Sequence, residues 1–277
     1  MHWKEAQVAI TGAGSGIGRA LAHALSKRGA NLWLSDIDGD SAQRVGEEVG
    51  GGEAAQLDVQ DAEAFRRHID GVVDASGRID VLFNNAGIGI GGDALDLEVE
   101  HYDRSLDVNV RGVVHGVLAA QPHMTKQRSG VLVNVASAAG LLGVPLMAPY
   151  SMSKFAVVGL SRSLRIELAE YGVQVSVLCP TAIETPLLDK PMSPVEGSAI
   201  WRPDIRTYLT KVGGAPFPVD RFVERALRRI EKNHAVIIEP GGARIRVALA
   251  NWFPGLVERI GRLAFREEIA KKPAPGS

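Results

Sequence analysis

The chain of 277 residues is long enough for one large α/β domain or two small ones. It is 45% hydrophobic and 23% charged, which is typical of a globular protein with a sizeable core. The formal net charge is −1 and the sequence has no long block of like charges, so we expect no nucleic-acid partner. Its single cysteine, Cys179, excludes an intramolecular disulfide framework and fits a reducing compartment, so we expect a cytoplasmic protein.

Two stretches bear on targeting and on membranes. The N-terminus, Met1–Glu5, has no apolar secretory core, so we expect no targeting signal. The segment Ser129–Ser153 is uncharged, but a spanning helix needs about twenty mostly apolar residues. Because Gly140, Gly143 and Pro145 interrupt this segment, we predict a buried strand and a loop there.

Strand and helix patterns alternate along the chain. Apolar runs predict strands over Val8–Thr11, Asn31–Asp36, Ala54–Val59, Ile79–Asn84, Gly130–Ala136, Val173–Leu178 and Ala235–Ile238. Helical spacing predicts helices over Gly16–Arg28, Ser41–Val49, Asp61–Ser76 with Asp61 as its cap, Glu100–Lys126, Tyr150–Tyr171 and Val219–Lys232. This alternation predicts one doubly wound, Rossmann-type α/β domain over residues 1–277, with a seven-stranded parallel sheet and helices on both faces.

The first strand leads into a glycine-rich turn, Thr11-Gly12-Ala13-Gly14-Ser15-Gly16-Ile17-Gly18, and then into a helix. The free N–H groups and the dipole at a helix start favour a pyrophosphate, and glycines let the backbone approach it. We therefore predict that cofactor contacts come from Gly12, Ser15, Gly16, Ile17 and Gly18. The spacing is G-x-x-x-G-x-G and not the common G-x-G-x-x-G, so a plain glycine-rich turn remains an alternative for this stretch alone.

The second strand ends at Asp36, where dinucleotide folds use an acidic residue to bind the adenosine ribose hydroxyls. The same carboxylate would repel a 2′-phosphate, and neither Ser15 nor Ile37 supplies a positive charge nearby. The sequence therefore predicts NAD and not NADP. A capping or turn role for Asp36 is the alternative, since Asp38 and Asp40 follow it.

The next two strands also end in candidate cofactor contacts. Asp58 and Val59 follow the third strand and could meet the adenine, although Asp58 could equally be a turn aspartate. Asn85, Ala86 and Gly87 follow the fourth strand and could let the chain pass close to the cofactor, or form an ordinary turn.

Four features together resemble the short-chain dehydrogenase/reductases: the glycine pattern, Asn84-Asn85-Ala86-Gly87, Ser137, and Tyr150-Ser151-Met152-Ser153-Lys154. The resemblance covers about residues 6 to 187. It implies a nicotinamide-dependent oxidoreductase of the predicted fold. It also implies a homodimer or homotetramer, assembled through the two long helices before and after the fifth strand.

The chemistry of the last motif follows from its residue types. A free phenol, with a pKa near ~10, is a poor base at neutral pH. Lys154 lies four residues after Tyr150 on the same helical face, so its ammonium would stabilise the phenolate; both side chains are also expected to contact the cofactor. Ser137, at the end of the fifth strand, would orient the substrate oxygen. The family resemblance adds Asn109 as part of a water-linked proton relay to the lysine.

Each of these four catalytic candidates has a structural alternative. Ser137 could only ease packing, Asn109 could bond locally to backbone, Tyr150 could belong to the core, and Lys154 could be solvated. Their joint occurrence downstream of a nucleotide turn favours the catalytic interpretation. No metal site is predicted.

After the sixth strand the family has Pro-Gly and then a threonine that contacts the nicotinamide carboxamide. Pro180 and Thr185 match this pattern, and Ile183 could pack on the nicotinamide ring. Thr181 stands in place of the glycine, and its β-branched side chain restricts the backbone there.

Two later segments complete the prediction. Residues 187–218 are punctuated by prolines and carry Met192, Trp201 and Tyr208, which suggests a lid over an apolar substrate, with a fixed packed helix as the alternative. Residues 240–277 form a helical extension with interleaved arginines and a frayed tail over Lys271–Ser277. Its apolar stripe consists of Leu249, Phe253, Leu256, Ile260 and Leu263. We expect this stripe to pack on the domain or on a partner subunit; peripheral membrane contact is the less favoured alternative.

The sequence therefore predicts an NAD-dependent oxidoreductase that interconverts a secondary alcohol and a ketone, with a hydrophobic or bulky substrate of steroid or long-chain type. One alternative is an NADP-linked carbonyl or ketoacyl reductase. Another is a non-catalytic nucleotide-binding scaffold or sensor on the same fold.

Overall fold

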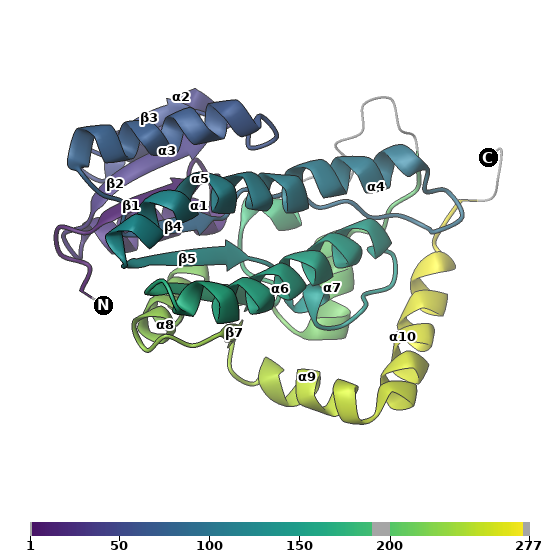
Figure 1. Cartoon of the computed structure of the whole chain (residues 1–277). Helices are drawn as coiled ribbons and strands as arrows, with labels where there is room; N and C mark the ends of the chain where they lie inside the picture. Colours follow the sequence, from purple (N-terminus) through teal and green to yellow (C-terminus); the bar gives the residue numbers. More distant parts are fainter. Residues whose placement is uncertain (1, 190–199, 274–277) are drawn as a thin grey trace.

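A computed structural model describes residues 2–189 and 200–273, and its centre is one parallel sheet of seven strands (Figure 1). The strands are β1 Gln7–Thr11, β2 Asn31–Asp36, β3 Glu53–Gln56, β4 Val81–Asn84, β5 Gly130–Val135, β6 Val173–Pro180 and β7 Val236–Glu239. Their order in the sheet is β3-β2-β1-β4-β5-β6-β7, and every neighbouring pair is parallel. The predicted fold class is confirmed.

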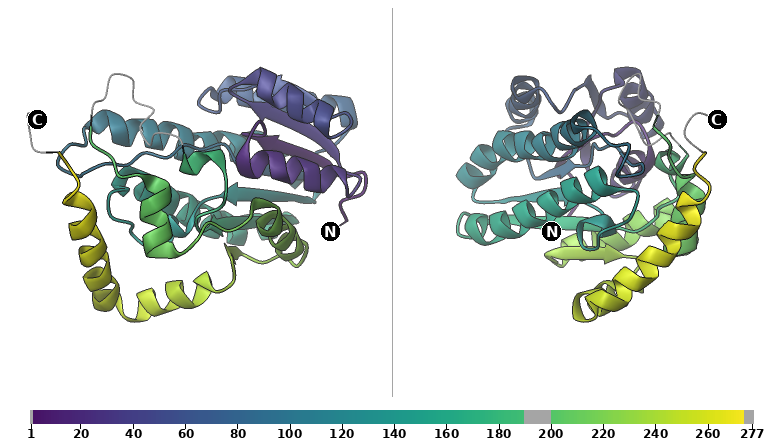
Figure 2. Two further views of the ribbon diagram at one scale, coloured as in Figure 1. Left: turned by 180° about the vertical axis from the view of Figure 1, so that it is seen from behind. Right: turned by 90° about the vertical axis from the view of Figure 1, so that its right-hand side faces the viewer.

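Helices cover both faces of the sheet (Figures 1 and 2). They are α1 Gly16–Ser26, α2 Gly39–Glu48, α3 Ala62–Ser76, α4 Val99–Leu106, α5 Gly112–Gln127, α6 Ala148–Ala169, α7 Ile205–Gly213, α8 Val219–Glu231, α9 Ala243–Trp252 and α10 Pro254–Ile269. Three shorter turns are the π-helical η1 Asp107–Arg111 and the 3-10 turns η2 Ala138–Gly140 and η3 Pro186–Leu188.

Two hydrophobic cores sandwich the sheet. Successive side chains of a strand point to opposite faces, so Ile10 of β1 packs in the core under α1 and α8, while Ala9 packs in the core under α3, α5 and α6. Leu21 and Phe222 anchor the first core, and Phe65 anchors the second, all three fully buried. Burial on both faces explains the nearly continuous apolar strands.

Strand bounds differ from the prediction by one residue at several ends and by two or more at three strands. Strand β4 begins at Val81, two residues after the predicted start at Ile79. The predicted third strand ran to Val59, but β3 ends at Gln56 because its partner β2 ends at Asp36, the residue paired with Gln56. Strand β6 continues to Pro180, two residues beyond the prediction, because β7 offers it a partner as far as Glu239.

The long helix predicted over Glu100–Lys126 is interrupted at its centre. Helices α4 and α5 are joined by the π turn η1 over Asp107–Arg111, in which Gly112 N donates to the carbonyl of Asp107. The side chain of Asn109 in this turn is fully buried. Single π turns of this kind occur often at functional sites.

Helix capping follows the sequence closely at two helices. Asp61 caps α3 as predicted, accepting from Ala64 N at 2.9 Å. Asp38 caps α2 by accepting from Ser41 N, so the capping role considered for Asp36 belongs to its neighbour.

The C-terminal extension forms α9 and α10, which run along one margin of the molecule (Figures 1 and 2). Helix α9 buries Ala243, Val247 and Ala250. Four residues of the predicted apolar stripe are not covered by the domain, because they are between 51% and 57% exposed: Leu249, Phe253, Ile260 and Leu263. That they pack on a partner subunit stays a prediction.

The predicted frayed tail is wrong at its start. Lys272 binds Asp93 at 2.6 Å and Asp96 at 2.8 Å, so this end of the extension is tied to the loop after β4. Within the described residues, no helix is both long and apolar enough to cross a membrane.

Candidate active site

The glycine-rich turn lies between β1 and α1, at the switch point where the strand order reverses between β1 and β4. Gly12 and Gly16 have positive φ values of 63° and 53°. A Cβ on Gly18 would lie 2.1 Å from the carbonyl oxygen of Gly12, so a side chain there would disrupt the turn. Glycine is therefore required at these three predicted positions on steric grounds.

The start of α1 fits an anionic group. Ser15 is its N-cap, yet its exposed side chain makes no capping hydrogen bond within the described structure. The first N–H groups of the helix, beginning at Gly16 and Ile17, and the Ser15 hydroxyl are available to the phosphates of a dinucleotide.

Asp36 lies beside this turn. Its Oδ2 accepts from Gly14 N at 2.9 Å, and its Oδ1 accepts from Asp38 N at 3.1 Å. A Cβ on Gly14 would lie 3.0 Å from Asp36 Oδ2 and 1.9 Å from Ser41 Oγ. The sequence analysis did not single out Gly14 as a contact residue, although it lies inside the motif; only glycine fits between Asp36 and Ser41.

The loop after β4 interlocks with the glycine turn. Thr11 Oγ1 accepts from the backbone N–H groups of Asn85 and Ala86, both at 3.1 Å. Asn85 Nδ2 donates to the carbonyls of Thr11 (2.9 Å) and Gly12 (3.1 Å). The Asn85 side chain therefore fixes the shape of the turn, and Thr11, which the prediction omitted, holds the loop from the other side.

Asp58 and Val59 follow β3, and their contacts come from Gln60 and from residues of α4 and α5. The Asp58 carboxylate accepts from Gln60 N and Nε2, and Gln60 in turn accepts from Arg104 at 2.7 Å. Val59 is 7% exposed, and its carbonyl is 2.9 Å from Nδ1 of His115. Gln60 and Arg104 belong to no recognised sequence motif. Only the structure shows that Gln60 binds Asp58 and that Arg104 binds Gln60.

The loop after β6 lies close to Gly16, where the glycine turn leads into α1. A Cβ on Gly16 would lie 3.4 Å from Cβ of Thr185, which places Thr185 beside α1. Ile183 is buried, and the Pro180 carbonyl accepts from Ser137 Oγ at 3.4 Å. Thr181 does not adopt a positive φ, and its N–H donates to Glu239 O at 3.2 Å, so the missing glycine introduces no backbone strain.

Tyr150, Lys154 and Ser137 come together at the carboxyl end of β5. Tyr150 and Lys154 share one face of α6, with Lys154 Nζ 5.6 Å from the centre of the Tyr150 ring. Burial raises the pKa of Tyr150, and its side-chain hydrogen bond with Ser137 opposes that rise. The three side chains place a phenol, an ammonium group and a hydroxyl within one small region.

Lys154 is 3% exposed and donates from Nζ to the Val135 carbonyl at 3.1 Å. Burial lowers the pKa of this amine to about 8. A Cβ on Gly87 would lie 3.3 Å from Lys154 Nζ and 3.0 Å from Asn109 Oδ1. Gly87 therefore leaves room for the side chains of the lysine and the asparagine.

Asn109 fixes the loop that carries Gly87. Its Oδ1 accepts from Ile88 N at 2.8 Å, and its Nδ2 donates to Ile88 O and to Ser153 Oγ, both at 3.0 Å. These bonds link the π turn to a loop 21 residues earlier and to α6. The local alternative for Asn109 therefore does not describe its main partners, which are distant in sequence.

An apolar cluster surrounds Tyr150. Met147, Leu188 and Ile205 are buried there, with Val144 and Leu209 packed around them. Of the predicted lid 187–218, the structure describes η3, α7 and their connections, whereas Met192 lies outside the described residues.

Helix α7, which belongs to the predicted lid, is also attached to the loop after β6. Arg206 of α7 binds Glu184 and Asp189, each at 2.6 Å, so α7 is attached to the segment that carries Thr185. This attachment gives the predicted lid a defined position over the apolar cluster.

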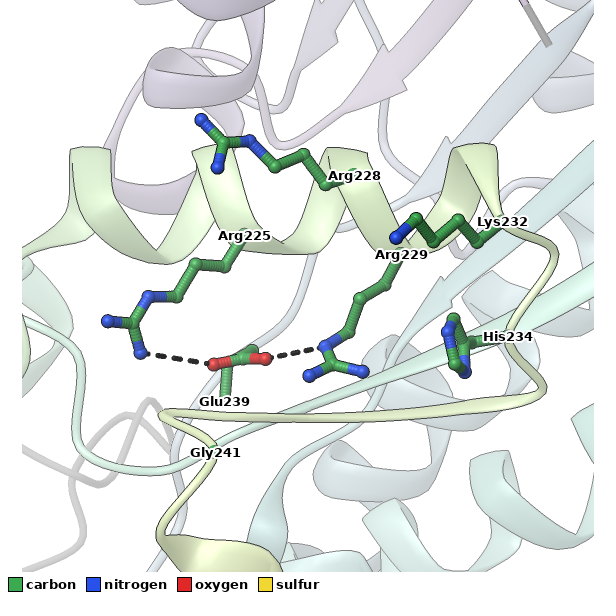
Figure 3. Close-up of a pocket in the computed structure, with 7 residues that line it drawn as sticks. All are labelled: Arg225, Arg228, Arg229, Lys232, His234, Glu239 and Gly241. Atoms are coloured by element: carbon green, nitrogen blue, oxygen red, sulfur yellow. Dashed lines mark hydrogen bonds and ion pairs between the residues drawn. The ribbon is translucent and has the colours of Figure 1, made fainter.

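A cavity of about 320 Å³ lies between α8 and β7 and is lined by Arg225, Arg228, Arg229, Lys232, His234, Glu239 and Gly241 (Figure 3). Glu239 is 2% exposed and pairs with Arg229 (2.7 Å), Arg244 (3.2 Å) and Arg225 (3.5 Å). These pairs hold α8 and the start of α9 to the last strand. Across residues 2–189 and 200–273, no group of three or more His, Cys, Asp or Glu side chains could hold a metal ion.

Comparison with known proteins identifies the family to which this fold belongs. The family described as "short chain dehydrogenase" matches residues 6–194. The chain is 39% identical to an uncharacterized oxidoreductase of Thermotoga maritima over 182 residues, which is 65% of this chain and 72% of that protein. It is 35% identical to the 3-oxoacyl-[acyl-carrier-protein] reductase FabG of the same organism, over 65% of this chain and 75% of that protein.

A solved structure extends the similarity to almost the whole chain. A short-chain dehydrogenase/reductase from Burkholderia phymatum in complex with NAD has a TM-score of 0.81 and 28% sequence identity. The match covers 92% of this chain and 96% of that chain.

Proposed function

The chain belongs to the short-chain dehydrogenase/reductase family of oxidoreductases, and on that premise we propose that it is an NAD-dependent enzyme interconverting a secondary alcohol and a ketone. The observation that carries the proposal is the meeting of Tyr150, Lys154 and Ser137 at the carboxyl end of β5. The glycine turn and Asp36 lie at the carboxyl ends of β1 and β2 in the same sheet, and Gly14 N donates to Asp36.

The proposed mechanism moves one proton at the substrate oxygen. Bound nicotinamide supplies the hydride to a ketone or accepts it from an alcohol. Tyr150 Oη gives its proton to the ketone oxygen in reduction and takes the alcohol proton in oxidation. The Lys154 ammonium stabilises the phenolate that forms in reduction, and Ser137 Oγ holds the substrate oxygen within reach of Tyr150.

The substrate class follows from the surroundings of Tyr150. Met147, Leu188 and Ile205 form an apolar wall around the phenol, and α7 lies over it. Burying apolar groups of the substrate against this wall would contribute about 25 cal/mol for each Å² removed from water. We therefore propose a hydrophobic or bulky alcohol, of steroid or long-chain type.

Asp36 supplies the test of cofactor choice. We expect wild-type protein to bind NADH more tightly than NADPH, because the carboxylate accepts from the ribose hydroxyls and repels a 2′-phosphate. Asp36→Asn keeps an acceptor for Gly14 N but removes the charge, and is expected to weaken NADH binding about fivefold to tenfold while strengthening NADPH binding. Titration of protein fluorescence with each nucleotide measures both.

Asp40→Ala is the matched control, because Asp40 is an exposed acidic residue of the neighbouring α2. It should leave the preference unchanged. Tighter NADPH binding by the wild type would favour the NADP-linked carbonyl or ketoacyl reductase. Tight NADH binding without hydride transfer to a broad panel of ketones would favour the non-catalytic scaffold.

We also propose that the enzyme is a homodimer or homotetramer assembled through α5 and α6. These helices expose Leu118 (57%) and Ile166 (77%) on their outer surfaces. Sedimentation velocity of the wild type should give a dimer or tetramer, and Leu118→Glu/Ile166→Glu should shift it toward monomer because burying unpaired carboxylates is unfavourable. A wild-type monomer at micromolar concentration would contradict the assembly.

A further inference from the structure

Helices α9 and α10 present an exposed apolar face that neither the sheet nor its helical layers cover. Six large apolar side chains on the two helices and their junction are between 51% and 81% exposed: Ile245, Leu249, Trp252, Phe253, Ile260 and Leu263. Ile245, Leu249 and Trp252 follow i, i+4, i+7 spacing and so lie on one side of α9. Ile260 and Leu263 are similarly neighbours on α10. We call these six side chains the α9–α10 apolar face.

A surface with this many exposed large apolar side chains is unusual for a folded domain. Single exposed apolar residues need no explanation, but several large ones on two consecutive helices and at their junction mark an interaction surface. Trp252 is 81% exposed, and it adjoins Phe253, where α9 ends and α10 begins. Tryptophan and phenylalanine at a helix junction suit the boundary between headgroups and acyl chains of a bilayer.

The charges beside this face are mainly positive. Residues 243–272 contain seven basic and three acidic side chains, although the whole chain has a formal net charge of −1. All three carboxylates are already paired: Glu258 with Arg262, Glu267 with Lys211, and Glu268 with Lys271. Within the described part of the chain, Arg259 and Arg266 have no ion-pair partner. Unneutralised arginines next to exposed apolar side chains favour a negatively charged apolar surface.

A second copy of the chain fits this face less well. A two-fold contact would bring together two copies of the same positively charged patch, since such an interface uses one patch twice. The acidic groups that could compensate are those already paired within α10 or with α7. An anionic lipid surface offers negatively charged headgroups to the arginines and acyl chains to the aromatic side chains.

The same helices contact the lid over the candidate active site. Lys211 of α7 pairs with Glu267 of α10, and Arg246 of α9 donates to the carbonyl of Gly213 at 2.7 Å. A Cβ on Gly261 would lie 3.7 Å from Pro145, in the segment facing the apolar cluster. A membrane bound to α9 and α10 would therefore lie next to α7, the helix of the predicted lid over the candidate active site.

We propose that the α9–α10 apolar face docks this protein on the surface of an anionic phospholipid bilayer. Trp252 and Phe253 insert at the headgroup boundary, and Arg259 and Arg266 bind lipid phosphates. This proposal does not depend on the identity of the substrate or on the choice between NAD and NADP.

Vesicle sedimentation tests the proposal with the full-length chain. The wild type should pellet with vesicles of phosphatidylcholine and phosphatidylglycerol, and should remain in the supernatant with phosphatidylcholine alone. Trp252→Ser/Phe253→Ser should lower the partition coefficient by about tenfold or more. Arg259→Glu/Arg266→Glu should lower it by roughly fivefold for each arginine, and raising the salt concentration should reproduce that loss.

Tyr171→Ser is the matched control, because Tyr171 is an aromatic side chain that is 52% exposed at the end of α6, outside the two helices. It should bind vesicles as the wild type does, and circular dichroism melting should show that all variants fold. The proposal is wrong if the wild type stays in the supernatant with both vesicle types, or if the aromatic variant binds as well as the wild type. It is also wrong if Trp252→Ser/Phe253→Ser instead converts a dimer into a monomer without vesicles, which would identify a second copy as the occupant.

Discussion

Replacing Tyr150 with phenylalanine is expected to lower kcat by about a thousandfold. The variant loses only the hydroxyl that donates or accepts the proton at the substrate oxygen. Its ring still packs in the cluster with Met147, Leu188 and Ile205 and still faces Lys154. Substrate and cofactor binding should therefore change little, and the loss should appear in kcat and not in KM. Absorbance of the reduced nicotinamide under single-turnover conditions measures the chemical step.

The control for this prediction is Tyr171→Phe, which removes a hydroxyl from an exposed tyrosine. It should turn over at the wild-type rate. Near-wild-type turnover by Tyr150→Phe would remove Tyr150 from the mechanism, and the proposed acid–base chemistry with it.

Replacing Lys154 with methionine is expected to lower turnover without lowering the free energy of unfolding at pH 7. The variant loses the ammonium that stabilises the phenolate, so turnover should fall by about a hundredfold or more. Burial lowers the pKa of Lys154 to about 8, so in the wild type this ammonium is lost as the pH rises through that value. The rate of ketone reduction by the wild type should therefore fall above about pH 8, and the variant should lack this dependence.

The effect of this substitution on stability has the opposite sign. The folded-state pKa of Lys154 lies below its ordinary value of 10.5, so the unfolded chain binds the extra proton more readily between pH 8 and 10.5. Below pH 8 the buried charge therefore lowers the free energy of unfolding by about 3 kcal/mol, and this penalty disappears as the pH rises to 10.5. Losing the bond to the Val135 carbonyl offsets part of the gain in the variant.

Denaturant unfolding at pH 7 and at pH 10 checks this result. Lys154→Met should be at least as stable as the wild type at pH 7, and the difference should shrink at pH 10. A variant that is both active and less stable at pH 7 would show that Lys154 has a structural role only.

Local sequence patterns predicted most of the architecture, because each element carries its own evidence. Asp61 was identified as a cap from its position before a helical pattern, and the structure has it there. The spacing of Tyr150 and Lys154 required only helical geometry to place them together, and they share one face of α6. Predictions of this kind depend on residues close in sequence.

Features that depend on distant partners were not predictable in the same way. The end of β3 at Gln56 is set by the end of β2, and the position of Thr11 depends on a loop more than seventy residues later. Periodicity showed an apolar stripe on the C-terminal extension but not whether anything covers it. The structure leaves Trp252 81% exposed, a residue that the stripe prediction did not include.

The π turn between α4 and α5 has a consequence for variation in this chain. A π turn holds one residue more than a regular α-helical turn, so deleting any residue of 107–111 would let the segment wind as ordinary α-helix. The side chains of α5 would then keep their rotation relative to α4, because the wider turn is what accommodates the extra residue. Gly116 would still lie against Asn84 and Phe65. The deletion would instead change the environment of Asn109, whose bonds to Ile88 and Ser153 are made from within this turn. We therefore expect single deletions within 107–111 to keep the fold and lower activity, whereas a deletion inside α5 would turn the residues after it by about 100° and disrupt packing. Random deletion libraries screened separately for folding and for activity would show this contrast.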